Sequence, residues 1–371
     1  MRKENWTYRK VKEVCDKASS NIVLNKIENN VGDYALYGAS GFVKGVDFFH
    51  REEPYIGIIK DGSGVGRVDV FPAKSSLVGT MQYILPKKDC SLKFLCYALQ
   101  SLKLSDFVTG AAIPHIYFRD YGECVIPVPP LATQSRIVSE LDLLQSIIDK
   151  QKSQLKELDN LAQAIFYDMF GDPVENEKGW EVKKLGEYVL VKGRVGWKGY
   201  KKEDLRDSGP FAIGGSHITD EGNIDLSSPV FLSREKYEES PEIMVETGDL
   251  ILVQRGTIGK VGLVRDDIGE ATINPCVLIL RPISINNTFL LYYLLSRATQ
   301  IHINSLVRGV AQPMITQQQV NTLLVPVPPL SLQQSFAQKI GAVERQKELI
   351  NQSIREAQTL FDSRMEYYFE E

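Results

Sequence analysis

The chain has 371 residues, of which 43 are Lys or Arg and 47 are Asp or Glu, for a formal net charge of −4. With 24% charged and 43% hydrophobic residues, its composition is that of a globular protein and excludes wholesale disorder, a collagen-like chain and a disulfide-stapled mini-protein. Taken alone, the acidic balance also argues against a nucleic-acid binder, because such domains usually carry a basic footprint.

Neither a metal site nor a membrane segment is indicated by the sequence. The 5 Cys and 4 His are scattered, without the C-x-x-C or H-E-x-x-H spacing of zinc sites. The first residues lack the apolar stretch of a signal peptide, and apolar runs such as Phe289–Leu295 are far shorter than the roughly 18 residues of a membrane span. We therefore expect a soluble, cytoplasmic protein with no metal and no membrane partner.

An internal repeat divides the sequence into two copies of one module. The segment at Trp6 resembles one 174 residues later, and Val65–Val68 resembles Ile258–Val261, 193 residues later. Pro127–Leu131 recurs letter for letter as Pro326–Leu330, 199 residues later. The matched segments keep their order and the offset grows smoothly, as insertions in the second copy would produce.

Within each copy the pattern predicts a mixed, α+β module. Apolar runs bounded by Gly, Asp and Pro are typical of strands. The predicted strands are 55–59, 250–253, 261–264 and 277–280, and the predicted helices are 92–104 and 287–301. Gly62–Gly66 follows the first strand but lacks the Gly-Lys-Ser/Thr ending of a phosphate loop, so we expect a tight turn there.

The first copy is followed by a segment that predicts one long helix over 131–170. Its apolar residues recur at alternating intervals of four and three, a period typical of coiled coils, and Gln151 is a polar position in the same series. A helix of 40 residues would be about 60 Å long. The predicted contact seam is Ile137, Leu141, Leu144, Ile148, Leu155 and Leu158.

The second copy ends in a second long helix of the same kind. Lys347 is its polar seam position. The predicted apolar seam is Phe336, Ile340, Val343, Ile350 and Ile354. One such helix could belong to the core of a larger domain, but two that follow the same Pro-Pro stop favour an antiparallel coiled-coil pair within the chain.

A basic, glycine-rich loop lies near the start of the second copy. It holds five basic residues and no acid, with Tyr200 among them. The basic residues are Lys192, Arg194, Lys198, Lys201 and Lys202. A solvated charged loop and a loop that contacts DNA phosphates are the two interpretations.

A second candidate loop contains Arg308 and Gln312, whose side chains are of the types that pair with guanine and adenine in the major groove. The equivalent loop of the first copy contains Ile113 and His115. Side chains that differ within a shared Gly, Ala and Pro frame suit two readers of different sequences, although an ordinary packed loop is the alternative. Further candidate contacts are Lys60, Arg67, Arg119, Gln254, Arg255 and Lys260.

Charge is distributed unevenly along the chain. Residues 1–126 carry a net charge of +3, residues 127–170 of −2, residues 171–325 of −3 and residues 326–371 of −2. The net charge of −4 therefore averages a basic first copy with acidic helices and an acidic second copy that contains the basic loop.

No catalytic constellation recurs in the two copies. Glu181 and Lys183 form the E-x-K ending of a nuclease motif, but the equivalent segment of the first copy lacks it. Asn274–Val277 faintly resembles the Asn-Pro-Pro-aromatic motif of amino-methyltransferases, but its third and fourth residues differ and no Gly-rich cofactor loop accompanies it. A repeated module without repeated catalytic residues suggests binding.

The chain resembles the specificity subunit of type I restriction-modification enzymes over its whole length. The resemblance rests on the two copies, the two long helices and the Pro-Pro-Leu-x-x-Gln motif, which stands at Pro129–Gln134 and Pro328–Gln333. It implies target-recognition domains at 1–128 and 172–327, separated by long helices at 129–171 and 328–371 that form the antiparallel pair.

The resemblance further implies that each domain reads one half of a bipartite site in double-stranded DNA, with the helices as spacer and docking surface. Methylation subunits, two in number, would bind S-adenosylmethionine, and a restriction subunit would use ATP and Mg²⁺. This chain would be non-catalytic and need no cofactor. A coiled-coil scaffold whose two domains bind proteins is the alternative, and a solitary nuclease or methyltransferase comes third.

Overall fold

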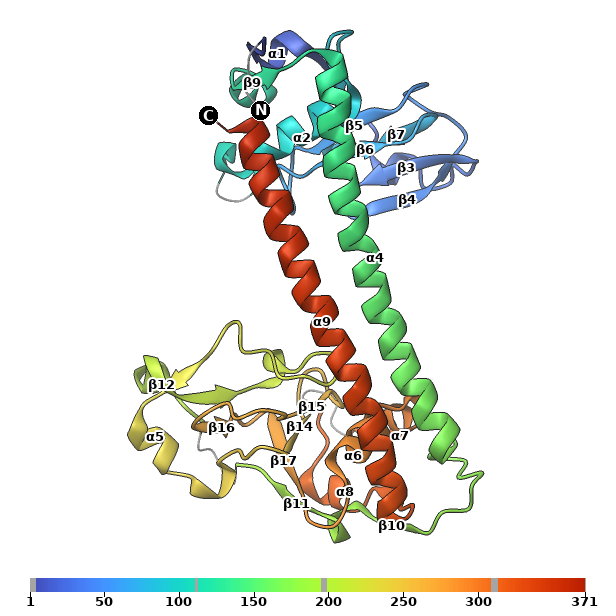
Figure 1. Cartoon of the computed structure of the whole chain (residues 1–371), viewed down its shortest axis with the longest axis vertical. Helices are drawn as coiled ribbons and strands as arrows, with labels where there is room; N and C mark the ends of the chain where they lie inside the picture. The colour runs from blue at the N-terminus through green and yellow to red at the C-terminus, as the bar shows by residue number, and fades with distance from the viewer. Residues whose placement is uncertain (1–4, 111–112, 195–198, 308–312, 371) are drawn as a thin grey trace. The chain divides into compact units, whose positions relative to one another are not determined.

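The computed structural model describes residues 5–110, 113–194, 199–307 and 313–370. The chain forms two compact units (Figure 1). Unit 1 combines residues 1–152 with 351–371, and unit 2 is residues 153–350. None of the described helices combines the length and the apolarity needed to cross a membrane.

Unit 1 contains the first copy, built from three small sheets. The strands are β1 Thr7–Lys10, β2 Cys15–Ser19, β3 Tyr34–Gly38, β4 Gly41–Val46, β5 Tyr55–Ile59, β6 Val68–Phe71, β7 Ser75–Leu77, β8 Met81–Pro86 and β9 Val125–Val128. They are ordered β1-β9, β2-β8-β5-β6 and β4-β3-β7. Every pair is antiparallel except β3 with β7.

Unit 2 contains the second copy with the same topology. The strands are β10 Val182–Lys184, β11 Val189–Lys192, β12 Leu205–Ile213, β13 Phe231–Leu232, β14 Leu250–Val253, β15 Val261–Leu263, β16 Ala271–Ile273, β17 Val277–Pro282 and β18 Leu324–Pro326. They are ordered β10-β18, β11-β17-β14-β15 and β13-β12-β16. The pair β12 with β16 is parallel, as its counterpart is in unit 1. The repeat read from the sequence is therefore a repeat of topology.

A central strand in each copy is buried on both faces, which explains its unbroken apolar run. In β5, Ile56 and Ile58 belong to one apolar cluster, and Tyr55 and Ile59 belong to another. In β14 the alternate residues divide in the same way between two clusters. Because successive side chains of a strand point to opposite faces, both faces need apolar residues.

Each copy also contains shorter helices. They are α1 Val11–Val14, α2 Leu92–Ser101 and α3 Phe118–Tyr121 in unit 1, and α5 Arg234–Glu238, α6 Asn287–Leu295, α7 Arg297–Leu306 and α8 Gln317–Asn321 in unit 2. Short 3₁₀ turns occupy 24–26, 104–107, 185–187, 202–204, 215–217 and 241–243. The helix predicted over 287–301 is two helices, because the Ser296 side chain accepts a hydrogen bond from Thr299 N and begins α7.

The two long helices are α4, Leu131–Phe170, and α9, Leu330–Phe369, each of 40 residues (Figure 1). In unit 1, Glu140 of α4 pairs with Arg364 of α9 at 2.6 Å, and Gln151 Nε2 donates to Ser353 Oγ at 2.5 Å. Residues later in α4 thus meet residues earlier in α9, so the helices are antiparallel.

In unit 2 the same order continues. Asp159 of α4 pairs with Lys347 of α9 at 2.8 Å, and the ring of Phe336 lies against Phe166 and Phe170, with centroids 5.7 and 5.3 Å apart. The expected fold class, α+β repeats with a long antiparallel helix pair, is confirmed.

The predicted seam residues lie mostly inside the two units. Ile137, Leu141, Leu144, Ile148, Phe336, Ile340 and Val343 are buried. Leu155, Leu158, Ile350 and Ile354 are half-buried. Toward the end of α4 the most deeply buried residues are Phe166 and Phe170, one position later than the strict period places them. The larger rings fill the space against Phe336 and Phe289.

A buried glutamine fastens the start of each long helix to its globular copy. Gln134, which is 0% exposed, donates to the carbonyls of Asp89 and Pro129 at 2.9 Å each, and its Oε1 accepts from Ser91 N at 2.8 Å. Gln333 repeats this in unit 2, where it donates to Pro328 O at 2.8 Å and accepts from Asn286 N at 2.9 Å. The final Gln of the Pro-Pro-Leu-x-x-Gln motif thus has a structural role, because it holds the start of each long helix against its globular copy.

Candidate nucleic-acid interface

In the first copy, two segments that are distant in sequence lie side by side. They are the turn that follows β5 and the segment that precedes α3. Gly62 N donates to Pro114 O at 2.9 Å, and Ile116 N donates to Lys60 O at 3.0 Å. These bonds set Asp61 opposite His115. The predicted candidates Lys60 and His115, more than 50 residues apart in the sequence, therefore belong to one site.

The side chains of this first-copy site form an edge-to-face aromatic pair, a cation–π contact and an ion pair. The rings of His115 and Tyr117 have centroids 4.4 Å apart, and the Arg119 guanidinium lies 4.5 Å from the Tyr117 centroid. Asp61 pairs with Lys60 at 3.1 Å, and its carboxylate is 3.9 Å from His115 Nδ1. Tyr117 is not among the predicted site residues, since an isolated Tyr carries no signal until the fold brings it beside its partners.

The second copy builds the same bridge with different side chains. Ile315 N donates to Gln254 O at 3.1 Å, and Arg255 stands opposite Met314. Gln254 is 8% exposed and donates from Nε2 to Pro275 O at 3.0 Å. Gln254 therefore positions the backbone from within, whereas Arg255 is more accessible.

A pocket of 410 Å³ opens beside this second-copy bridge. Its lining residues are Arg194, Gly199, Gln254, Arg255, Pro275, Met314, Thr316 and Gln317. Arg194 Nε donates to Ile273 O at 2.8 Å, and Arg255 Nη2 points to Met314 Sδ at 3.7 Å. Burial lowers the pKa of the Arg194 guanidinium, although Glu239 and Glu242 act in the opposite direction. The pocket therefore gathers three predicted residues, Arg194, Gln254 and Arg255.

Other predicted residues lie outside these two sites, several of them with acidic partners. Arg67 pairs with Asp69 at 3.4 Å, Lys201 with Glu203 at 3.4 Å and Lys260 with Asp220 at 2.6 Å. Lys192 ends β11, and Tyr200 is half-buried. Lys198, Arg308 and Gln312 lie outside the described residues.

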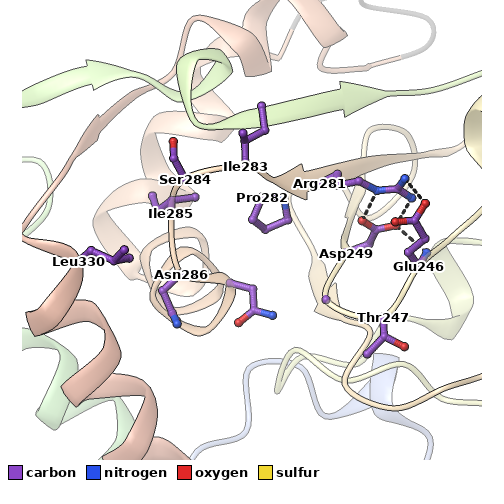
Figure 2. A pocket seen from close by; sticks show the side chains of 12 residues that line it. Glu246, Thr247, Asp249, Arg281, Pro282, Ile283, Ser284, Ile285, Asn286 and Leu330 are labelled. Carbon is purple, nitrogen blue, oxygen red and sulfur yellow. Dashed lines mark hydrogen bonds and ion pairs between the residues drawn. The ribbon is translucent and has the colours of Figure 1, made fainter.

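A different pocket of unit 2, of 490 Å³, has its charges satisfied internally (Figure 2). Arg281 donates to both carboxylate oxygens of Asp249 at 2.8 Å and also pairs with Glu246. Asp249 is 1% exposed. These hydrogen bonds raise the pKa of Arg281, and they leave it a structural role that ties β14 to β17.

The motif fragments that suggested enzymes have local structural roles. Lys183 of β10 pairs with Glu181, the residue before that strand, at 2.5 Å. Asn274 Oδ1 accepts from Cys276 N at 2.8 Å and shapes the turn between β16 and β17. Within the described ranges, no three His, Cys, Asp or Glu side chains are grouped so that they could hold a metal ion.

Known proteins share this architecture. The S subunit of the type I restriction-modification system from M. genitalium matches with a TM-score of 0.58 and 17% sequence identity, over 99% of this chain and 96% of that one. At that identity the likeness shows the fold alone.

Curated relatives are similar in sequence. The type I restriction enzyme MjaVIII specificity subunit of Methanocaldococcus jannaschii is 24% identical over 310 residues, 77% of this chain and 71% of the relative. The EcoBI specificity subunit of Escherichia coli is 22% identical over 277 residues, 67% of this chain and 57% of the relative. The alignment thus spans little more than half of the E. coli protein.

The model of the type I restriction modification DNA specificity domain matches the chain twice, at residues 3–160 and 177–359. Each match covers one globular copy and most of the long helix that follows it. The chain therefore belongs to the type I restriction-modification DNA specificity family.

Proposed function

We propose that this chain is the DNA-recognition subunit of a type I restriction-modification system and that each copy reads one half of a bipartite site. The observation that carries the proposal is the bridge found in both copies. The same backbone hydrogen bond joins Ile116 to Lys60 and Ile315 to Gln254, yet the side chains around it differ. A constant frame with variable polar side chains suits two readers of different base sequences.

The proposed readers are residues 1–128 and 172–327, and the helices at 129–171 and 328–371 form the spacer. Half-sites that face the same side of B-DNA lie about 34–36 Å apart, one helical turn, and a 40-residue helix extends about 60 Å. The helices are therefore long enough to span two half-sites and still offer a surface to partners.

Apolar side chains on the outside of the helix pair support docking of partner subunits. Leu143 is 62% exposed and Leu360 49% exposed in unit 1, and Leu349 is 67% exposed and Leu161 47% exposed in unit 2. We propose that two methylation subunits dock here and supply S-adenosylmethionine, that a restriction subunit supplies ATP and Mg²⁺ chemistry, and that this chain, a cytoplasmic protein, is non-catalytic.

Co-expression with its methylation subunit in a host that lacks DNA methylation tests the proposal. Mapping of methylated adenines should reveal one bipartite motif with a fixed, unspecified spacer. Binding of the purified complex to that motif should weaken steeply with salt, each neutralised phosphate adding about 0.9 to the slope of log affinity against log salt.

The same preparation separates the competing functions. Assembly with the methylation subunits without site-specific DNA binding would indicate a protein scaffold and refute the proposal. Methyl transfer or DNA cleavage by this chain alone would indicate an enzyme. A matched control is the complex without this chain, which should methylate no bipartite motif.

A further inference from the structure

The two copies carry side chains of different charge at equivalent positions of the same backbone arrangement. The first such position is at the end of the parallel strand pair. In unit 1 the Ser20 hydroxyl donates to Leu77 O, the last carbonyl of β7, at 2.5 Å. In unit 2 Arg194 Nε donates to Ile273 O, the last carbonyl of the equivalent strand β16, at 2.8 Å. A guanidinium thus occupies the place of a hydroxyl.

The second difference lies at the bridge. Asp61 of the first copy faces His115 and neutralises Lys60 at 3.1 Å. Arg255 stands in the place of Asp61 and faces Met314. Within the described part of the chain, Arg255 makes no ion pair, and its buried Nε has no hydrogen-bond partner. Its Nη2 reaches only the sulfur of Met314, a weak acceptor, at 3.7 Å.

These substitutions give the second-copy pocket the features of an anion site. Arg194 and Arg255 both line its 410 Å³, together with Thr316 and Gln317, which add neutral polar groups. A guanidinium whose buried N–H lacks an acceptor is costly, and a phosphate oxygen would satisfy it through a short, charge-assisted hydrogen bond. At the equivalent bridge of the first copy, the nearest cation already has a carboxylate partner.

We propose that the Arg194–Arg255 pocket of the second copy holds one backbone phosphate of the DNA, and that the equivalent site of the first copy holds none. This inference rests on the proposed function. Arg255 is then a positioning residue that fixes the second reader on the duplex and leaves base reading to other side chains. The first reader depends instead on the cluster of His115, Tyr117 and Arg119.

The test uses the complex of the full chain with its methylation subunits and a duplex that carries the mapped site. Arg255→Gln should lower the salt slope by about 0.9, equivalent to about a threefold smaller change in affinity over a fourfold range of salt. The loss of affinity should be the same for duplexes with altered bases. Phosphate-ethylation interference should disappear at one phosphate in the second reader's half-site.

Two variants serve as controls. Arg255→Lys keeps the charge and should keep most of the slope, and it covers the case in which Arg255→Gln does not fold. Arg234→Gln removes the same charge from the same copy, at a side chain already paired with Glu238 and Glu270, and should leave the slope unchanged.

Three results would overturn the proposal. The first is an unchanged slope with a folded Arg255→Gln variant. The second is a loss of affinity that is confined to duplexes with one particular base and that Arg255→Lys shows as well. Such a result would indicate a bidentate guanine contact, which needs the guanidinium fork. The third is stabilisation of the DNA-free complex by inorganic phosphate that depends on Arg255 while the DNA slope does not. Failure of the wild-type complex to bind any site would instead refute the proposed function.

Discussion

Replacement of Gln134 by Leu should destabilise unit 1 far more than a typical substitution on a helix. The change removes three hydrogen bonds and leaves Pro129 O, Asp89 O and Ser91 N without their partner. A buried backbone group without a partner costs about 1–3 kcal/mol. The bond to Pro129 is buried and the other two are partly buried, where water can compensate in part. The expected loss in the free energy of unfolding is about 2–5 kcal/mol.

Hydrogen exchange measured by mass spectrometry reports this loss separately for each unit. Peptides from α2 and the start of α4 should exchange faster, whereas peptides from 250–295 should not change. Gln145→Leu is the matched control, because the Gln145 amide donates only to Asp149 on the same exposed helix face and its loss should cost less than about 0.5 kcal/mol. A Gln134→Leu protein whose free energy of unfolding is within about 0.5 kcal/mol of the wild type would refute this structural role of Gln134.

Three further perturbations follow from the helix pair and the ion pairs. Leu144→Asp places a carboxylate at a position that is 9% exposed, so it should separate α4 from α9 and abolish co-purification with methylation subunits. Leu143→Asp, at a position that is 62% exposed, should leave the circular dichroism spectrum unchanged and therefore tests docking alone. Lys347→Met should change the unfolding midpoint in urea little. Asp159→Ala should lower the free energy of unfolding by about 1–3 kcal/mol, because it leaves the buried Lys347 ammonium with one carboxylate partner, Glu344 at 3.2 Å, in place of two; equal effects would contradict this. Hydrogen bonds from two lysines lower the pKa of Glu123 to about 2. Its contribution to stability is therefore complete above the unfolded pKa of about 4.3 and is lost as the pH falls toward 2. Glu123→Gln should make the free energy of unfolding depend less on pH between about 4.3 and 2, and an unaltered pH profile would count against the ion pairs.

Much of the architecture could be predicted because it rests on periodicity. The repeat, the long helices and the continuously apolar strands 55–59 and 250–253 follow from spacings that the sequence displays directly. The sequence does not predict which residues near the end of α4 are buried. Phe166 and Phe170 are buried because their rings pack against Phe336, and the heptad spacing does not contain that information. Burial at such positions depends on a contact with a residue distant in the sequence, and the local pattern does not reveal that contact.

The site was harder to predict for the same reason. Basic and amide side chains were identifiable by type, yet their meaning depends on partners that are distant in the sequence. Asp61 pairs with Lys60, and Gln254 donates to Pro275 O, and neither partner could be identified from the residue type alone. Arg255 gains its significance only from the position that it shares with Asp61 of the other copy.

The division of α4 and α9 between the units has a consequence for biosynthesis. Unit 2 is one continuous stretch, residues 153–350, whereas unit 1 needs residues 351–371 to complete it. Tyr368 and Phe369 belong to its apolar core, where the ring of Phe369 lies 5.3 Å from Phe94. Domains generally fold in the order in which the ribosome makes them. The core of unit 1 is complete only after residues 351–371 have been made, so we expect that unit 2 can fold before unit 1.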